Sequence, residues 1–218
     1  MITLYRLLAG LIGLFALALQ YGLVAQDLSG PALVSWTINF FSFFTIWSNI
    51  VVALAMLLPV VAPNSSPGRF LARPSVRTAI AGYIIIVFGV YFFILRLTWD
   101  PQGWNKVADQ LLHYLTPALF VIDWLLFVPK GQVRWKLITA SLAFPLVYML
   151  WTLAHGAMSS WYPYPFVDVT KLGYPTVLKN MAALFGVFVA APLALIVTGR
   201  IIAGLGAGPN DLHSQPES

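Results

Sequence analysis

Long apolar runs separated by short polar breaks dominate the pattern of this sequence of 218 residues. A helix needs about 20 mostly apolar residues to cross a bilayer. Runs of about that length cover residues 2–24, 34–60, 76–97, 108–128, 135–157 and 176–201. They are continuous and lack the alternation of polar and apolar residues found in the strands of membrane barrels. The pattern therefore predicts an all-α polytopic membrane protein with six transmembrane helices.

The breaks between the runs contain Ser, Asn, Pro and Gly, which are typical of turns, notably at 29–31, 64–68 and 129–131. No internal repeat or change of composition divides the chain. We therefore expect one six-helix transmembrane domain over residues 1–203 and a disordered cytoplasmic tail over residues 204–218.

Composition excludes several classes of protein. Hydrophobic residues make up 60% of the chain, charged residues only 9%, and the mean hydropathy is +0.83. Soluble domains carry roughly 25% charged residues, so this chain cannot cover a solvated surface. With no cysteine, it has no disulfide, thiolate nucleophile or cysteine-bound cluster. The net charge of +5 is dispersed between the apolar runs, so we expect membrane lipid, and no nucleic acid, as a partner.

The positive-inside rule orients the helices. If both termini are cytoplasmic, that side and its helix ends hold Arg6, Arg69, Arg73, Arg77, Lys130, Arg134, Lys136 and Arg200. The opposite side then holds fewer basic residues, namely Arg96, Lys106, Lys171 and Lys179, together with Asp27, Asp100, Asp109 and Asp168. The bias therefore predicts cytoplasmic termini.

The first run has a competing interpretation as a cleaved signal peptide, because only Arg6 precedes its apolar stretch. The run is longer than a typical signal core and no small-residue cleavage site follows it. We therefore interpret it as the first transmembrane helix.

A polar stripe interrupts the second run, where Ser48 and Asn49 follow Thr45 within about one helical turn. A threonine in a membrane helix usually donates back to the carbonyl of residue i−4, here Phe41. Polar side chains of this kind also join neighbouring helices. From the residues alone, contact between helices is the stronger interpretation, and a nucleophilic hydroxyl is the alternative.

Two ionisable residues in the fourth run are candidates for function, because charges in lipid are costly. His113 follows Asp109 by one helical turn, and a structural contact with that residue would explain it. Asp123 lies 80° around the helix from His113 and ~15 Å farther along it. Asp123 is therefore expected to be a structural polar anchor, not the acid that orients the histidine. His155 and Asp168 belong to the same outer half as His113.

Common motifs of soluble enzymes are missing from the sequence. It has no phosphate-binding glycine loop, no HisGluxxHis pair and no GlyxSerxGly elbow. We therefore expect no metal and no cofactor. Any chemistry depends on hydroxyl and imidazole groups, because a threonine can attack an ester when a histidine accepts its proton. A dry apolar chamber would suit an acyl chain.

Three segments together resemble the androgen-inducible and androgen-dependent TFPI-regulating family of membrane proteins. They are PhePheThrIleTrpSer at 43–48, HisTyrLeuThrPro at 113–117 with an acid ten residues after the histidine, and Tyr148, Trp151 and His155 followed by TrpTyrProTyrProPheValAsp at 161–168. The resemblance covers most of the chain. It implies six helices and, from the animal members, a threonine hydrolase that cleaves fatty acid esters of hydroxy fatty acids.

Carried over by position, the resemblance implies that Thr45 is the nucleophile and His113 the catalytic histidine. The family's later acid falls on Asp123, and its TyrProPhe segment on 164–168. The proline at Pro117 comes one residue early, and TyrPro is doubled in the loop. The segment TrpAspProGlnGlyTrp at 99–104 is similar to bacterial relatives, so we expect a bacterial cell membrane.

The resulting hypothesis is an intramembrane hydrolase of lipid-derived acyl esters. Thr45 and His113 should converge in an enclosed cavity, with Ser48 or Asn49 donating to the oxyanion. His155 and Asp168 should line its outer mouth. One rival is a b-type haem held between His113 and His155. Another is a protein that binds lipids or small molecules without turnover.

Topology can be tested with reporters fused to the chain. A reporter at the carboxyl end or in residues 64–68 should be cytoplasmic, and one near Gln102 or Asp168 should be outside, because of the bias in basic residues. Protease protection and reporter activity would locate each fusion. A cytoplasmic reporter at Gln102 would overturn the orientation.

Overall fold

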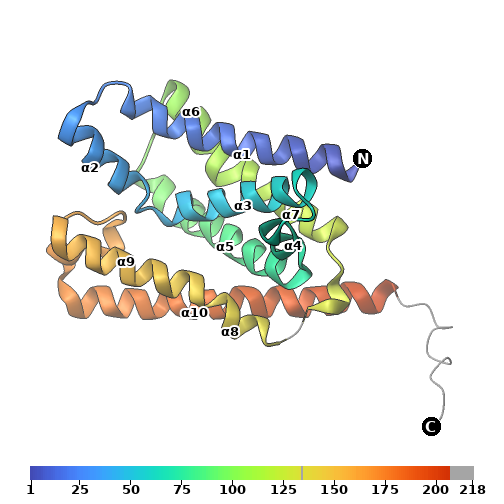
Figure 1. Ribbon diagram of the computed structural model, residues 1–218. Helices are drawn as coiled ribbons and strands as arrows, with labels where there is room; N and C mark the ends of the chain where they lie inside the picture. The colour runs from blue at the N-terminus through green and yellow to red at the C-terminus, as the bar shows by residue number, and fades with distance from the viewer. Residues whose placement is uncertain (134, 207–218) are drawn as a thin grey trace, which may run out of the picture.

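Helices form all the regular secondary structure in the computed structural model, which describes residues 1–133 and 135–206 (Figure 1). The α-helices are α1 Ile2–Ala25, α2 Gly30–Phe40, α3 Phe44–Val61, α4 Ser66–Ala72, α5 Pro74–Phe93, α6 Gly103–Gln110, α7 Thr116–Phe127, α8 Leu137–Ser141, α9 Ala143–Ser159 and α10 Val169–Gly206. Short 3-10 turns occupy Leu95–Leu97, Lys130–Gln132 and Pro165–Val167, and Leu111–Leu115 forms one π-helical turn.

Six helical segments within the described residues are long and apolar enough to cross a membrane, which confirms the all-α polytopic prediction. They are Ile2–Ala25, Phe44–Val61, Pro74–Leu97, Gly103–Phe127, Thr139–Ser159 and Val169–Gly204. Figure 1 shows the start of α1 and the end of α10 at the same end of the bundle, as an even number of spans requires. Because α10 continues through Gly206, the expected domain boundary at residue 203 falls inside this helix. The rest of the expected tail, residues 207–218, lies outside the described residues.

The second apolar run is not the single helix that its pattern predicts. It divides into α2 and α3, which are separated by Phe41, Ser42 and Phe43. The fourth run contains the π-helical turn, and the fifth divides into α8 and α9. The break after α2 contains neither glycine nor proline, so no local residue marks it in the sequence.

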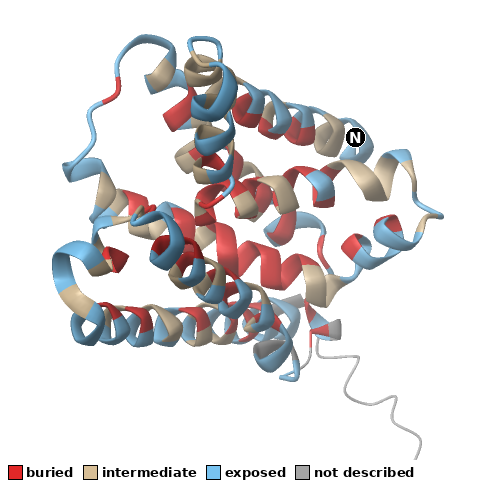
Figure 2. Cartoon of the chain, turned by 60° about the vertical axis from the view of Figure 1, so that its left-hand side comes forward, coloured by how far each residue is buried: buried red, intermediate tan, exposed pale blue. Residues whose placement is uncertain are grey.

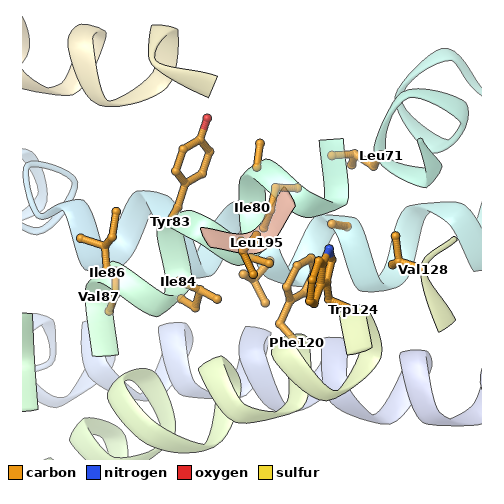
Figure 3. Close-up of a cluster of buried hydrophobic side chains, with 14 of the residues drawn as sticks. Leu71, Ile80, Tyr83, Ile84, Ile86, Val87, Phe120, Trp124, Val128 and Leu195 are labelled. Atoms are coloured by element: carbon orange, nitrogen blue, oxygen red, sulfur yellow. The ribbon is translucent and has the colours of Figure 1, made fainter. Parts of the chain in front are cut away.

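Helix α5 forms the centre of the bundle and packs against α3, α7 and α10. From Ala79 onward its residues are apolar or aromatic on every side, which is typical of a helix enclosed by protein. In Figure 3, Ile80 and Ile84 of α5 lie beside Phe120 and Trp124 of α7 and Leu195 of α10.

Large apolar side chains are left on the outside of the bundle. On α1, for example, Leu4, Leu11 and Phe15 are all more than half exposed. Figure 2 shows buried residues gathered in the middle of the molecule and exposed ones around its perimeter. An apolar exterior of this extent matches an acyl-chain environment and not water.

Asp123 of α7 is the centre of a buried ionic cluster. Its carboxylate lies 2.7 Å from Nε of Arg6 on α1 and also pairs with Arg77 on α5. Asp123 and Arg77 are 0% and 2% exposed, respectively. Arg77 was counted in the sequence among the basic residues of the cytoplasmic side, but it is a buried partner of Asp123. Without Arg77, the cytoplasmic side still has more basic residues than the opposite side. The cluster joins α1, α5 and α7 at one end of the bundle.

Pro59 inside α3 and Pro145 in the first turn of α9 explain further side-chain contacts. Proline has no N–H to donate to the carbonyl four residues earlier. Pro59 of α3 therefore leaves the carbonyl of Ala55 without its helical donor, and Arg77 Nη1 donates to that oxygen over 2.6 Å. Similarly, Tyr83 donates over 2.6 Å to the carbonyl of Ser141, four residues before Pro145. Both donors come from the central helix α5.

The ionic cluster should dominate stability at its end of the bundle. Asp123→Asn leaves Arg6 and Arg77 without their counter-charge, and breaking a buried pair in this way costs about 3 kcal/mol or more. Thermal unfolding of the detergent-purified protein should show a large fall in Tm. Asp27→Asn provides the control, since Asp27 is exposed and makes no ion pair with described residues. Equal Tm values for the two variants would contradict the role given to the cluster.

Candidate functional site

The break between α2 and α3 places a helix amino terminus inside the bundle. The backbone carbonyls at the break have lost their helical N–H donors, and side chains donate hydrogen bonds to them instead. Ser42 Oγ donates to Ile38 O over 2.8 Å, and Trp47 Nε1 donates to Phe41 O over 2.5 Å. From α9, Tyr148 donates to Ser42 O and Trp151 donates to Ser42 Oγ, each over 3.0 Å. The break is therefore a supported feature of the fold.

Thr45 stands in the first turn of α3, directly after this break. The expected hydrogen bond from its hydroxyl to Phe41 is not formed; Oγ1 instead lies 3.4 Å from the Tyr164 hydroxyl. The backbone N–H of Thr45, which has no helical acceptor in the first turn, also donates to this hydroxyl over 3.3 Å. The helix dipole adds partial positive charge at the same point. The side of Thr45 that faces Tyr164 thus favours a negative oxygen.

A small apolar cavity of about 50 Å³ borders Thr45. Phe44, Val87 and Phe188 contribute to its apolar wall. Its hydroxyl groups come from Thr45, Tyr148, Thr152 and Tyr164.

Two of these hydroxyls have distinct environments. The Thr152 hydroxyl is buried and interacts with the neighbouring Tyr148 hydroxyl, although the two do not form a hydrogen bond of good geometry. Burial raises the pKa of Tyr164 above its ordinary value, although hydrogen bonds at Thr45 act in the opposite direction. The Tyr164 hydroxyl therefore keeps its proton at neutral pH and can act as a donor.

Ser48 and Asn49 are fully enclosed but do not line this cavity. Asn49 Nδ2 donates to Thr45 O over 2.9 Å and to Leu112 O over 3.2 Å. It therefore connects α3 with the π-helical turn that carries His113. Ser48 Oγ is buried without a partner among the described residues. The arrangement gives neither side chain the position expected of an oxyanion donor at Thr45.

His113 belongs to a second polar group, formed with Tyr91 of α5 and Asp109 of α6. Its Nδ1 lies 3.1 Å from both the backbone O and the Oδ1 of Asp109. Tyr91 donates to the other carboxylate oxygen, and its ring stacks on the imidazole with centroids 3.9 Å apart. With Nδ1 facing these acceptors, Nε2 is the nitrogen left to accept a proton.

The sequence predicts that Thr45 and His113 converge in one cavity, but the structure does not bring them together. No hydrogen bond links them in the described chain, and His113 does not line the Thr45 cavity. The nearest bonded connection is indirect, through Asn49 and the carbonyl of Leu112, the residue before His113. Asp123 lies outside both groups, in the ionic cluster.

His155 and Asp168 also occupy places outside the Thr45 cavity. His155 lines a groove between α2 and α9, where its Nε2 lies 3.0 Å from Asn39 Oδ1. Its ring stacks on that of Trp151. Neither this groove nor the Thr45 cavity is lined by both histidines, so neither holds the arrangement expected for a haem between them.

Asp168 caps the start of α10. It accepts bonds from the N–H and hydroxyl of Thr170 over 3.0 and 2.5 Å. The bond from the Thr170 hydroxyl is the main cause that lowers the pKa of this carboxyl. Phe166 and Val167, directly before it, reach the cavity instead. Asp168 thus anchors the segment that carries Tyr164.

Several residues of the site were missed in the sequence. Tyr164 and Tyr148 lie within segments that carry the family resemblance, yet their hydroxyls were given no role. Thr152 follows Tyr148 by one turn of α9 and therefore shares its face. The spacing of Tyr148 and Thr152 could have indicated in the sequence that both lie on one face of α9. No residue in the sequence indicated the break after α2.

Comparisons with known proteins do not place the chain in a family: no family model, curated protein or solved structure matches it.

Proposed function

We propose that this protein is a membrane hydrolase that cleaves lipid-derived acyl esters at the Thr45 cavity. The observation that carries the proposal is the Thr45 hydroxyl at the amino terminus of α3, facing the Tyr164 hydroxyl beside an apolar cavity. Such a position offers a nucleophile, donors for a developing oxyanion and a wall suited to hydrocarbon. The resemblance of residues 43–48 and 161–168 to membrane threonine hydrolases adds support.

In the proposed reaction, Thr45 Oγ1 attacks the ester carbonyl carbon and gives up its proton to a base. The bond from that carbon to the alcohol oxygen then breaks, the alcohol leaves with a proton, and an acyl-threonine remains. Water gives a proton to the base and attacks the carbonyl carbon of this second ester. The bond from that carbon to Thr45 Oγ1 then breaks, the fatty acid leaves, and the base returns the proton to Oγ1. At each tetrahedral stage the Tyr164 O–H and the Thr45 N–H donate to the oxyanion.

His113 is the proposed base. Asp109 occupies the Nδ1 side of the imidazole, so Nε2 is the acceptor, as in other nucleophile–base pairs whose base is oriented by a third group. Proton transfer requires His113 to move off Tyr91 toward α3, or a water molecule to bridge the two. Catalytic hydrogen bonds commonly tighten only when substrate binds.

The substrate class follows from the surroundings of Thr45. Apolar walls and an apolar exterior favour a membrane lipid or a related acyl ester over a soluble ester. A cavity of about 50 Å³ is smaller than a typical ligand pocket, so acyl chains require it to widen. We place the protein in a bacterial cell membrane because of the resemblance of residues 99–104.

One observation favours a second candidate, a lipid-binding protein without turnover. Thr45 has no hydrogen bond to a histidine or carboxylate in the described chain; its polar neighbour is the neutral Tyr164. An apolar cavity with hydroxyl donors can bind a carbonyl group without attacking it. Nucleophilic reactivity at Thr45 separates the two candidates.

Labelling with a fluorophosphonate probe tests the nucleophile before the substrate is known. Wild type should be labelled, Thr45→Ser should keep measurable labelling, and Thr45→Val should lose it with little change in Tm, because shape is preserved while the hydroxyl is removed. His113→Gln should lose most labelling. The variant that combines Thr45→Val with His113→Gln should be labelled little less than whichever single variant is labelled less, as expected for residues acting as a unit. Wild-type labelling of Thr45→Val would rule out the hydrolase in favour of the binding protein.

Tyr164 provides an independent test of the oxyanion site. Tyr164→Phe keeps the ring and removes one donor, which should lower kcat for a long-chain p-nitrophenyl ester by about 10²-fold. Tyr162→Phe is the matched control, because its ring packs on Gly156 and does not line the cavity. If both variants lose activity equally, Tyr164 does not stabilise the oxyanion.

A further inference from the structure

A groove separate from the Thr45 cavity runs between α4 and α5 on one side and α8 and α9 on the other. Its volume is about 760 Å³. Leu71, Ile80 and Phe144 contribute apolar wall, while Arg73 and Lys136 bring cationic groups to the same groove. No carboxylate among the described residues lines it. The groove therefore combines hydrocarbon surface with positive charge.

These two cations have no counter-charge from the described chain. Arg73 lies over the Phe70 ring at 5.8 Å and, like Lys136, forms no ion pair there. The acid of the ionic cluster is already paired with Arg6 and Arg77. Both groove cations are exposed, so an anion can reach them.

The position of the cations in the fold indicates where such an anion lies. Arg73 directly precedes the span Pro74–Leu97, and Lys136 comes shortly before the span Thr139–Ser159. Both therefore flank membrane-crossing helices at one end of the bundle, at the level of lipid headgroups. Partly exposed apolar groove residues such as Phe144 lie farther along these spans. This order, charge at the interface and apolar surface beyond it, matches an amphiphile with an anionic head.

We propose that this groove binds an anionic phospholipid of the bilayer. The phosphate lies between the Arg73 guanidinium and the Lys136 ammonium, and one acyl chain extends along Val76 and Phe144, which are both partly exposed. Basic pockets between transmembrane helices bind anionic headgroups in this way, and guanidinium groups match phosphate with two parallel hydrogen bonds. The charge complementarity selects an anionic over a zwitterionic lipid. The site does not depend on Thr45.

Native mass spectrometry of the purified full chain measures this selectivity directly. Wild type is incubated with phosphatidylglycerol or with phosphatidylcholine of identical acyl chains. It should retain phosphatidylglycerol at least tenfold better, and Arg73→Gln combined with Lys136→Gln should abolish most of that preference. The control removes the same charge elsewhere through Arg69→Gln with Lys179→Gln and should keep it. Equal loss in both double variants, or equal retention of the two lipids by wild type, overturns the proposal.

Two further arms separate a lipid site from a simple phosphate site. Ala143→Trp adds an indole to the groove wall without changing charge and should also reduce phosphatidylglycerol retention by about tenfold, provided that its Tm stays near the wild-type value. Millimolar inorganic phosphate should not displace the lipid. Displacement by phosphate, or full retention by a folded Ala143→Trp protein, excludes an acyl chain in the groove.

Thr45→Val should retain the lipid like wild type, whatever its effect on hydrolysis.

Discussion

A backbone carbonyl that loses its helical donor inside a bilayer cannot turn to water, and this constraint shapes the whole bundle. The helices are interrupted at several points, and side chains donate hydrogen bonds to the carbonyls that have lost their helical donors. Tyr83 donates to Ser141 O, Arg77 to Ala55 O, and Tyr148 to Ser42 O. These bonds join α5 to α8, α5 to α3, and α9 to the break before α3. The same interactions that satisfy the backbone therefore fix the positions of α3, α5 and α9 relative to one another.

The candidate site is a consequence of one such interruption. If α2 continued into α3, the N–H of Thr45 would be committed within a helix and could not face Tyr164. The break exposes that N–H inside the bundle, and the cap of α10 at Asp168 anchors the segment that brings Tyr164 to it. The His113 group depends on another irregularity, since the π-helical turn carries the imidazole while Asn49 joins the turn to α3. The two irregular segments thus place the proposed nucleophile and base on adjacent elements without joining them.

Hydrophobic runs predicted the number and approximate ends of the spans because lipid imposes a minimum length on an apolar helix. They could not predict the break at Ser42, where the supporting groups, Tyr148 and Trp151, lie over 100 residues later in the chain. Helix geometry correctly separated Asp123 from His113, but the Arg6 and Arg77 contacts depend on how three helices pack. The sequence also drew attention to Thr45 and His113. It could not reveal that each faces a different tyrosine, because that depends on the rotation of α3 and of the π-helical turn.

A double-mutant cycle on Tyr83 and Pro145 tests the central claim that side chains replace missing helical donors. In the presence of Pro145, Tyr83→Phe removes the hydrogen bond from the Tyr83 hydroxyl to Ser141 O and should lower the free energy of unfolding by about 1 kcal/mol. After Pro145→Ala, the backbone N–H of residue 145 can donate to that carbonyl, so Tyr83→Phe should cost much less, giving a coupling of similar size. Denaturant titration of the four purified proteins measures it. An equal cost of Tyr83→Phe in both backgrounds would contradict the account.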